Sequence, residues 1–443
     1  MHRLRLLLVF ALVVIGILTI SPTAGAVPPA VKQATKTFDY TKNMHPLGYS
    51  AKLFPNNPNF DGWNSDLAFW GKTAYQGTIN GFRILNVKAP AKPREIVDYT
   101  DCAGDQGDVI VWKNILVRSW NSPAPAGATC GGLPVPQGQE GLHVFDVSNP
   151  KSPQVLTFVP LDCGSHTATG VPDKANNRLL VYNGNSGAAC PFIDIVEVPL
   201  DNPGDAAMIN RVDAMHTCHD IGVILGKVNK AACAGGEGVR VFGLGGESGG
   251  SLDDPELLFH VEIPGVTIGH SAAWSWDGKT IVFGHEPGGG ILAQCQATTP
   301  EVNKTLFFLD GSTGAIVGSL IFPRPQTALE NCTWHNYNVV PTKKRNILVS
   351  GNYQAGISVV DFTNPAKAFE FAYADPAPLP CCTTAFGLPL TLGGDWSSYW
   401  YNGFIYQSDI TRGLLIWKLS DKRVAGAKKL SHLNPQTQEF SIK

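Results

Sequence analysis

The sequence has little charge, and neither sign dominates. Charged residues make up 16% of the 443, and 34 basic against 36 acidic side chains leave a formal net charge of −2. A chain so close to neutrality offers no basic field to the phosphates of a nucleic acid, so general nucleic-acid binding is excluded. Hydrophobic residues reach 44%, which excludes a disordered chain.

Long apolar runs are missing after the first twenty residues. Arg3 and Arg5 precede an apolar run at 6–20, and small residues follow at 24–26. This pattern predicts a cleavable signal peptide over residues 1–26. An uncleaved anchor is the alternative, although the run is shorter than the ~20 residues that span a bilayer. We therefore expect no membrane span after signal cleavage, and a secreted, extracellular protein.

The spacings that hold zinc are also missing, since neither Cys-x-x-Cys nor His-Glu-x-x-His occurs. The cysteines instead number ten, all after residue 26. An even number in an exported chain favours five disulfides. The ten are Cys102, Cys130, Cys163, Cys190, Cys218, Cys233, Cys295, Cys332, Cys381 and Cys382.

Turn residues are abundant, with 47 glycines and 32 prolines, and they punctuate a repeat. One unit opens at His335 with an apolar strand, continues with strands at 346–351 and 356–362, and ends with a fourth at 368–374. The third strand of this unit recurs at seven places along the chain. These are residues 81–87, 141–147, 192–198, 238–244, 305–310, 356–362 and 413–419.

Each copy begins with a polar residue before an apolar strand, at a mean spacing of about 55 residues. These openers are Asp66, Asp108, His166, His219, His270, His335 and Asp395. Seven four-stranded units that cannot bury both sheet faces alone predict an all-β fold, a seven-bladed β-propeller. We expect the propeller over residues 44–420, after an N-terminal extension at 27–43, with an N-terminal strand completing the last blade. Residues 421–443 then form a C-terminal appendage.

Two segments resemble a known family. Residues 141–150, Gly-Leu-His-Val-Phe-Asp-Val-Ser-Asn-Pro, and 356–365, Gly-Ile-Ser-Val-Val-Asp-Phe-Thr-Asn-Pro, look like the LVIVD repeat of secreted bacterial proteins. The resemblance covers most of 44–420 and implies a propeller and export. The resemblance implies no particular activity, because that family has no single established activity. Blades 4 and 5 depart most from the pattern.

The seven openers would form a ring at one mouth of the central channel. Four consecutive imidazoles, at His166, His219, His270 and His335, are suitable ligands for a divalent transition metal. The aspartates Asp66, Asp108 and Asp395 would complete the ring and favour a cation. The alternative is that these side chains hydrogen-bond the backbone of the entering loops and line water.

Loops after the second strands should reach the same mouth, and one of them contains His285 and Glu286. A histidine and a carboxylate beside a metal could move a proton, which makes this pair the catalytic candidate. A solvated turn before Pro287 is the alternative interpretation.

The cysteines follow the repeat. Four precede ring positions and four follow second strands, so all eight belong to loops of one face. The register predicts the pairs 102–130, 163–190 and 218–233 within blades, 295–332 between blades, and a vicinal pair at 381–382. Disulfides, which stabilise a fold by ~2–4 kcal/mol each, would make the loops of that face rigid.

Two functions remain open. The first is an extracellular binding or interaction module, a monomer, with a site for an unidentified ligand, protein or metal at the channel mouth. The second is a metal-dependent (Cu/Zn/Fe) oxidase or hydrolase using the axial histidines. The methanethiol oxidase and selenium-binding propellers resemble this chain in placing histidines at successive blade starts, without an extended motif match.

Overall fold

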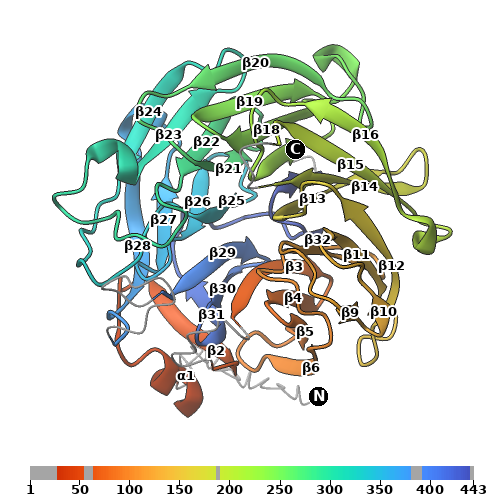
Figure 1. Ribbon diagram of the computed structural model, residues 1–443. Coiled ribbons are helices and arrows are strands. Elements are labelled where there is room, and N and C mark those ends of the chain that lie inside the picture. The colour runs from red at the N-terminus through yellow and green to blue at the C-terminus, as the bar shows by residue number, and fades with distance from the viewer. Residues whose placement is uncertain (1–26, 54–62, 186–189, 381–391, 440–443) are drawn as a thin grey trace, which may run out of the picture.

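The computed structural model describes residues 27–53, 63–185, 190–380 and 392–439. Within them, seven antiparallel sheets stand radially around one axis, each with four blade strands (Figure 1). The predicted all-β, seven-bladed propeller is confirmed. The expected signal peptide at 1–26 and the expected Cys381–Cys382 pair lie outside the described residues.

The first three blades are continuous in sequence, and each runs from the channel outward. Blade 1 is β3 (Asn64–Trp70), β4 (Thr73–Thr78), β5 (Gly81–Asn86) and β6 (Arg94–Tyr99). Blade 2 is β7 (Val109–Trp112), β8 (Ile115–Trp120), β11 (Glu140–Asp146) and β12 (Gln154–Leu161), with a hairpin of β9 (Thr129–Cys130) and β10 (Leu133–Pro134) before its third strand. Blade 3 is β13 (Thr167–Asp173), β14 (Arg178–Gly184), β15 (Phe192–Pro199) and β16 (Ala207–Asp213).

The next three blades repeat this order. Blade 4 is β17 (Ile221–Ile224), β18 (Lys230–Gly235), β19 (Gly238–Gly243) and β20 (Glu256–Glu262). Blade 5 is β21 (Gly269–Trp274), β22 (Thr280–His285), β23 (Thr305–Asp310) and β24 (Ile316–Ile321). Blade 6 is β25 (Asn336–Val339), β26 (Ile347–Gly351), β27 (Ile357–Asp361) and β28 (Phe369–Pro376). Short 3-10 turns lie in connections at η1 (Pro203–Asp205), η2 (Gly246–Ser248), η3 (Glu301–Lys304) and η4 (Pro365–Lys367).

Blade 7 closes the ring with strands from both ends of the fold. Its β29 (Asp395–Tyr401), β30 (Phe404–Asp409) and β31 (Gly413–Leu419) pair with β2 (Met44–Ala51), which follows the short helix α1 (Pro29–Ala34) and β1 (Phe38–Tyr40). The predicted N-terminal closing strand is confirmed. In addition, β1 joins the outer edge of blade 6 by pairing with β28.

Adjacent blades are held together by apolar side chains. Seven clusters of buried hydrophobic residues occur among the described residues, one between each pair of neighbouring blades. The first and last blades are joined in this way by aromatic stacking, since the rings of Phe69 and Tyr401 lie 4.6 Å apart. The core is therefore a closed circle of inter-blade layers, which leaves the channel side to polar residues.

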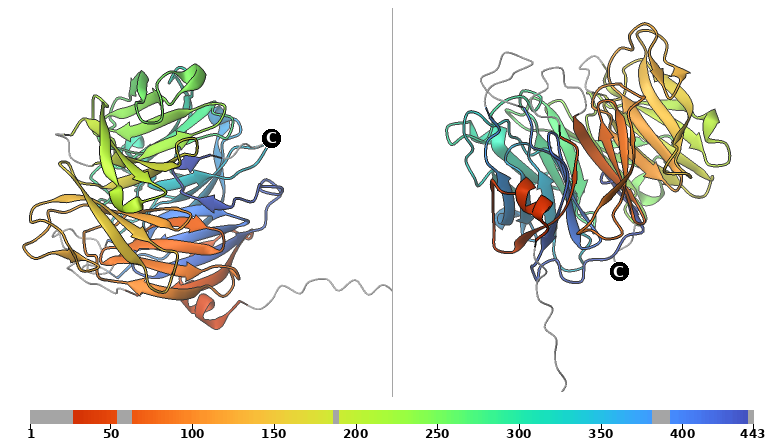
Figure 2. Two further views of the ribbon diagram at one scale, coloured as in Figure 1. Left: turned by 90° about the vertical axis from the view of Figure 1, so that its right-hand side faces the viewer. Right: turned by 90° about the horizontal axis from the view of Figure 1, so that it is seen from below.

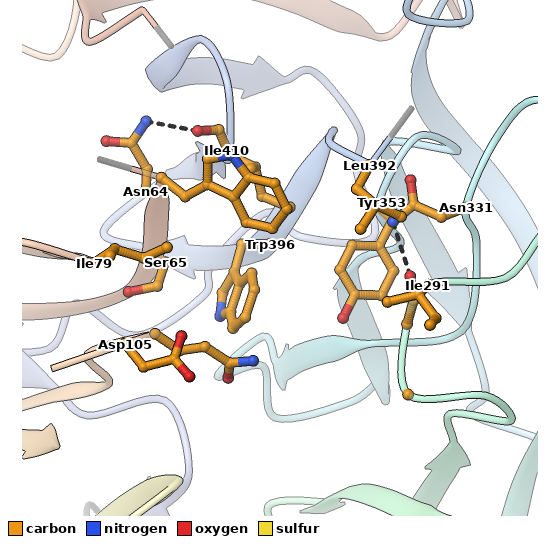
Figure 3. A pocket seen from close by; sticks show the side chains of 14 residues that line it. Asn64, Ser65, Ile79, Asp105, Ile291, Asn331, Tyr353, Leu392, Trp396 and Ile410 are labelled. Carbon is orange, nitrogen blue, oxygen red and sulfur yellow. Dashed lines mark hydrogen bonds between the residues drawn. The ribbon is translucent and has the colours of Figure 1, made fainter. Parts of the chain in front are cut away.

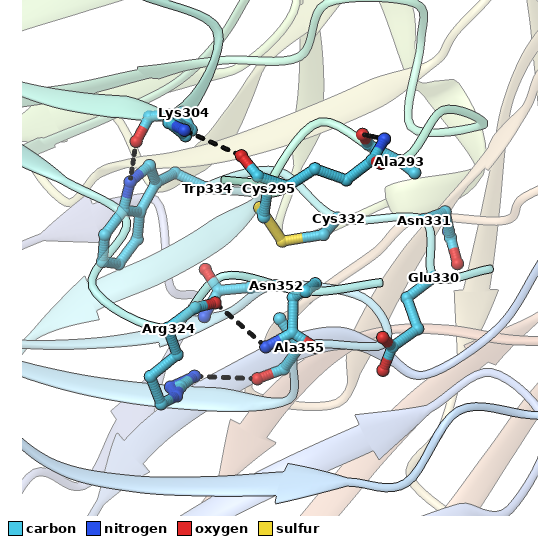
Figure 4. The surroundings of a disulfide bond; sticks show 12 residues. Ala293, Cys295, Lys304, Arg324, Glu330, Asn331, Cys332, Trp334, Asn352 and Ala355 are labelled. Carbon is cyan, nitrogen blue, oxygen red and sulfur yellow. Dashed lines mark hydrogen bonds between the residues drawn. A yellow bond between two sulfur atoms is a disulfide. The ribbon is translucent and has the colours of Figure 1, made fainter. Parts of the chain in front are cut away.

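The four bridges that the described residues can test connect as predicted: Cys102–Cys130, Cys163–Cys190, Cys218–Cys233 and Cys295–Cys332. Cys295–Cys332 joins a loop of blade 5 to the segment that enters blade 6 (Figure 4). Beside it, the Trp334 indole donates to the Lys304 carbonyl at 3.1 Å, and the Arg324 guanidinium donates to the Ala355 carbonyl at 2.9 Å. We call the face that carries these bridges, where the inner strands begin, the ring face.

The C-terminal segment crosses the channel at the opposite face. Its strands β32 (His432–Leu433) and β33 (Thr437–Gln438) pair with the ends of β3 and β17. Between them, the Asn434 side chain bonds both the N–H and the carbonyl of Val111, at 2.8 Å each. Figure 2 shows the seven blades of the disc from the side and from below. We call residues 430–439, which lie under the inner strands of blades 1 to 5, the tail.

The described residues include no helix that is long and apolar enough to cross a membrane.

Candidate metal centre at the channel mouth

The four ring histidines lie side by side at the start of consecutive inner strands. Ring centroids are 4.3 Å apart from His166 to His219, 4.0 Å from His219 to His270, and 4.3 Å from His270 to His335. All four are at most 9% exposed. The repeat brings them together because the same position opens each inner strand.

His335 has one ring nitrogen fixed by the backbone. Its Nδ1 lies 2.6 Å from the carbonyl oxygen of Trp396, which can only accept, so Nδ1 carries the proton. Nε2 therefore holds a lone pair, and it lies 3.5 Å from Glu286 Oε1. Burial lowers the pKa of His335 to about 3, so the imidazole is neutral. A neutral imidazole with an anchored Nδ1–H is the form that binds metals.

His270 is held in the same tautomer by a side-chain relay. The Ser271 hydroxyl donates to Asp220 Oδ2 at 2.7 Å, so His270 Nδ1, 2.6 Å from that hydroxyl, must donate to it. The lone pair of His270 Nε2 remains, 3.8 Å from Glu286 Oε2. Burial, followed by the neighbouring histidines, holds the pKa of His270 well below its ordinary value.

Asp220 also anchors His219, whose Nδ1 lies 3.2 Å from Asp220 Oδ1. Three histidines therefore share one arrangement, with Nδ1 bonded and Nε2 left for a ligand. Asp220 and Ser271 were missed by sequence reasoning. The signal was present for Asp220, because it directly follows a ring histidine and therefore lies at the mouth as well.

The ligand atoms of His270, Glu286 and His335 all lie within 4.8 Å of one another, and the same holds for His219, Asp220 and His270. We call these five residues the histidine–carboxylate cluster. Two imidazoles and a carboxylate are the ligand set of several catalytic zinc sites, in which a further position stays open. The cluster therefore fits a divalent transition metal.

Glu286 is the carboxylate nearest to the Nε2 atoms of His270 and His335. It is 5% exposed, and burial raises its pKa to about 7. The Tyr353 hydroxyl donates to its Oε1 at 2.5 Å. Its neighbour His285 points elsewhere: Nε2 of His285 lies 2.5 Å from the Val302 carbonyl, away from the cluster. Of the catalytic candidates, the structure thus places only Glu286 beside the ring histidines.

His166 differs from the other ring histidines. The Asn121 amide nitrogen, which can only donate, lies 2.9 Å from its Nδ1. Neutral His166 then carries its proton on Nε2, so neither nitrogen is available as a ligand in this state. The His166 ring contacts His219 but belongs to neither group of converging ligand atoms.

The ring aspartates lie apart from the cluster. Asp108 accepts from the backbone N–H groups of Val109 at 2.9 Å and Ala168 at 2.6 Å, which joins blade 2 to blade 3. Asp66 accepts from Gln436 of the tail at 3.2 Å. Asp395 accepts from the Ser398 hydroxyl at 2.6 Å. Burial is the main cause that raises the pKa of all three carboxyls.

A cavity of about 260 Å³ leads to the cluster from the ring face. His219, His270, Glu286 and His335 line it, together with Tyr353, Trp396 and the half-exposed His216. No lysine or arginine is found among its described lining residues. Glu286 thus has no lysine or arginine beside it among these lining residues, and a metal ion would supply the compensating charge.

Comparison with known proteins shows the fold and nothing finer. No family model matches the sequence, and no curated protein matches it. Among solved structures, a protein from Lactobacillus plantarum is similar at a TM-score of 0.52 and 9% identity, over 85% of this chain and 97% of that one. A chain of the mitotic checkpoint complex is similar at a TM-score of 0.51 and 10% identity, over 86% of this chain and 94% of that one. Such identities support a propeller-like fold alone.

Proposed function

We propose that this chain is an exported propeller that binds a divalent transition metal at its channel mouth and uses it to hold an extracellular ligand. His270, His335 and Glu286 are the proposed ligands, and His219 is the nearest further donor. The observation that carries the proposal is the convergence of two imidazoles on one buried carboxylate: His270 Nε2 and His335 Nε2 lie 3.8 and 3.5 Å from Glu286, while Nδ1 of each ring is bonded elsewhere.

Export and the relation to the LVIVD-repeat proteins are part of the same proposal. Four disulfides support an oxidising compartment, because such bridges are rare in reducing ones. The repeat segments 141–150 and 356–365 support the family relation, since each coincides with a third blade strand and the turn after it. We expect a monomer. Detection of the mature chain outside the producing cell, with residues 1–26 removed, tests this part.

The metal is tested by titrating the purified, chelator-treated protein with Zn²⁺ and Cu²⁺ in a calorimeter. We expect one ion per chain. Glu286→Gln removes a charged ligand, and His270→Ala with His335→Ala removes two imidazoles, so both should weaken binding at least tenfold. His216→Ala is the matched control, because His216 lines the same cavity outside the cluster. Binding that is absent, or equally weakened by His216→Ala, contradicts the proposal.

A metal-dependent oxidase or hydrolase is the second candidate, and the Glu286–Tyr353 pair favours it. A buried carboxyl whose pKa is raised to about 7 can take up and release a proton near neutral pH. In that case His219, His270 and His335 hold the metal, and Glu286 carries the proton. Turnover of an activated ester or a phenol by metal-loaded protein, lost in Glu286→Gln while the metal is retained, would favour this candidate.

A further inference from the structure

A second cavity lies beside the first on the ring face. It measures about 240 Å³ and is lined by loops of blades 1, 5, 6 and 7 and by the connection between blades 1 and 2 (Figure 3). Its apolar lining residues are Trp63, Ile79, Ile291, Leu392, Trp396 and Ile410. It is therefore chemically unlike its neighbour, which is lined by imidazoles and a carboxylate.

The two cavities share wall residues, and two of these hold the cluster in place. Tyr353 and Trp396 line both cavities. The Tyr353 hydroxyl donates to Glu286, and the Trp396 carbonyl accepts from His335. The two rings lie 6.3 Å apart at 90°, so each cavity meets an aromatic surface at the common wall. A molecule in the second cavity would thus lie directly beside the cluster.

Three polar side chains of the second cavity donate hydrogen bonds to the protein itself. The side-chain amide of Asn64 donates to the Ile410 carbonyl at 3.1 Å, and that of Asn331 donates to the Gly290 carbonyl at 2.9 Å. The Ser65 hydroxyl donates to the Gly107 carbonyl. Among the described lining residues, Asp105 is the single charged one. The cavity therefore offers apolar and aromatic surface and, among these residues, no lysine or arginine to bind an anion.

We infer that the second cavity binds a small uncharged aromatic molecule, such as a phenol, against the wall that it shares with the cavity of the histidine–carboxylate cluster. The inference rests on the proposed function, since a metal bound by Glu286 and His335 would also fix Tyr353 and Trp396 in that wall. An apolar cavity of about 150 Å³ already holds benzene, so 240 Å³ accommodates one substituted ring. Aromatic walls favour a flat ring over an aliphatic one of equal size.

The inference is tested with p-cresol, titrated into the full mature chain with and without Zn²⁺. We expect one molecule per chain, and at least threefold tighter binding to the Zn²⁺-loaded protein. Benzoate, which carries a negative charge, and cyclohexanol, which is not flat, should each bind at least tenfold more weakly than p-cresol. Equal binding of the three compounds, or no p-cresol binding, overturns the inference.

Three Ile→Trp variants locate the binding site. Ile79→Trp and Ile291→Trp place a large ring at partly exposed positions in the cavity wall, and each should weaken p-cresol binding at least tenfold. Ile316→Trp, on the outer strand of blade 5, is the matched control and should leave binding unchanged. An unchanged p-cresol affinity in both wall variants refutes the assignment.

Metal affinity is measured separately in every variant. If Zn²⁺ binds normally but p-cresol does not, the inference fails and the proposed function stands. If p-cresol binds and Zn²⁺ does not, the proposed function fails, and the phenol then lacks the metal that the inference requires.

Discussion

The most informative single substitution lies outside the candidate site, at His143. This residue is in the third strand of blade 2, is fully buried, and forms no hydrogen bond at either ring nitrogen within the described structure. It packs between aromatic rings, 4.6 Å from Phe158 and 5.2 Å from Trp120. Burial, aided by the charge of Arg118, lowers its pKa to about 3.

The pKa shift converts directly into a pH dependence of stability. In the unfolded chain His143 has an ordinary pKa near 6.5, so below pH 6.5 the imidazole is protonated in the unfolded state but stays neutral in the folded state. Stability is therefore lost as pH falls from about 6.5 towards 3. Between pH 7 and pH 5 the loss is about 2 kcal/mol from this residue alone.

His143→Phe should remove that loss. The ring is similar in size, its surroundings are aromatic, and no hydrogen bond disappears, so we expect the variant to be at least as stable as the parent at pH 7. Urea unfolding of the disulfide-intact protein at pH 7 and pH 5, followed by tryptophan fluorescence, measures the difference. The other buried histidines titrate in both proteins and cancel.

The exposed His260, on the outer strand of blade 4, supplies the control variant His260→Phe, which should retain the full acid loss. A parent-minus-variant difference that does not change between pH 7 and pH 5 would refute the argument. So would a large destabilisation of His143→Phe at pH 7, because it would mean that the imidazole has a polar partner.

Three further predictions concern the site, the ring face and the tail. Gly290→Ala should weaken Zn²⁺ binding at least tenfold, because a Cβ there would lie 2.3 Å from the Tyr353 hydroxyl that bonds Glu286. Gly289→Ala is the control, because that position has a similar positive φ but open space around it. Equal effects of the two variants on Zn²⁺ affinity would contradict this prediction. Removing the Cys295–Cys332 bridge should cost about 4 kcal/mol in urea unfolding, as expected for a loop of 37 residues, and a loss under 1 kcal/mol would refute that role. Deleting residues 430–443 should lower the free energy of unfolding by several kcal/mol, at about 1 kcal/mol for each hydrogen bond to the inner strands. The deletion should also raise the rate of amide hydrogen exchange in β7 and β17. Unchanged exchange rates would contradict the idea that the tail stabilises these strands.

The fold could be predicted because it repeats. A polar opener before an apolar strand defines the blade register, and that register also determines which loops share a face. The four disulfides that lie in the described residues could be paired on this basis alone. The β2 strand could be assigned because an apolar segment precedes the first blade, where the last blade needs a fourth strand.

The tail could not be predicted in this way. Its strands β32 and β33 have two residues each, too few for a period, and the segment between them binds through a side chain that takes the place of a backbone partner. Asn434, which bonds both polar groups of Val111, is the plainest case. In a sequence, such an asparagine cannot be told from a turn residue.

The repeat predicted which histidines lie together at the channel mouth, but not which nitrogen of each imidazole carries the proton. That property depends on partners distant in sequence, such as the Trp396 carbonyl, 61 residues from His335. Glu286 was a candidate in the sequence together with His285. The two side chains lie apart in the structure because neighbouring residues at the end of a strand point to opposite faces. Four of the five cluster residues were thus candidates in the sequence, whereas Asp220 and the protonation of each imidazole were not.

The two ends of the channel differ, and the difference determines how a ligand can reach the cluster. The tail lies across one mouth, where strand pairing and the Asn434 bonds hold it against the inner strands. At the other mouth, disulfides hold the loops, and both cavities open there. Because Tyr353 and Trp396 line both cavities and bond Glu286 and His335, a molecule in the apolar cavity would hold those two proposed metal ligands in place. Metal exchange should therefore slow when that cavity is filled, even though no ligand atom has changed.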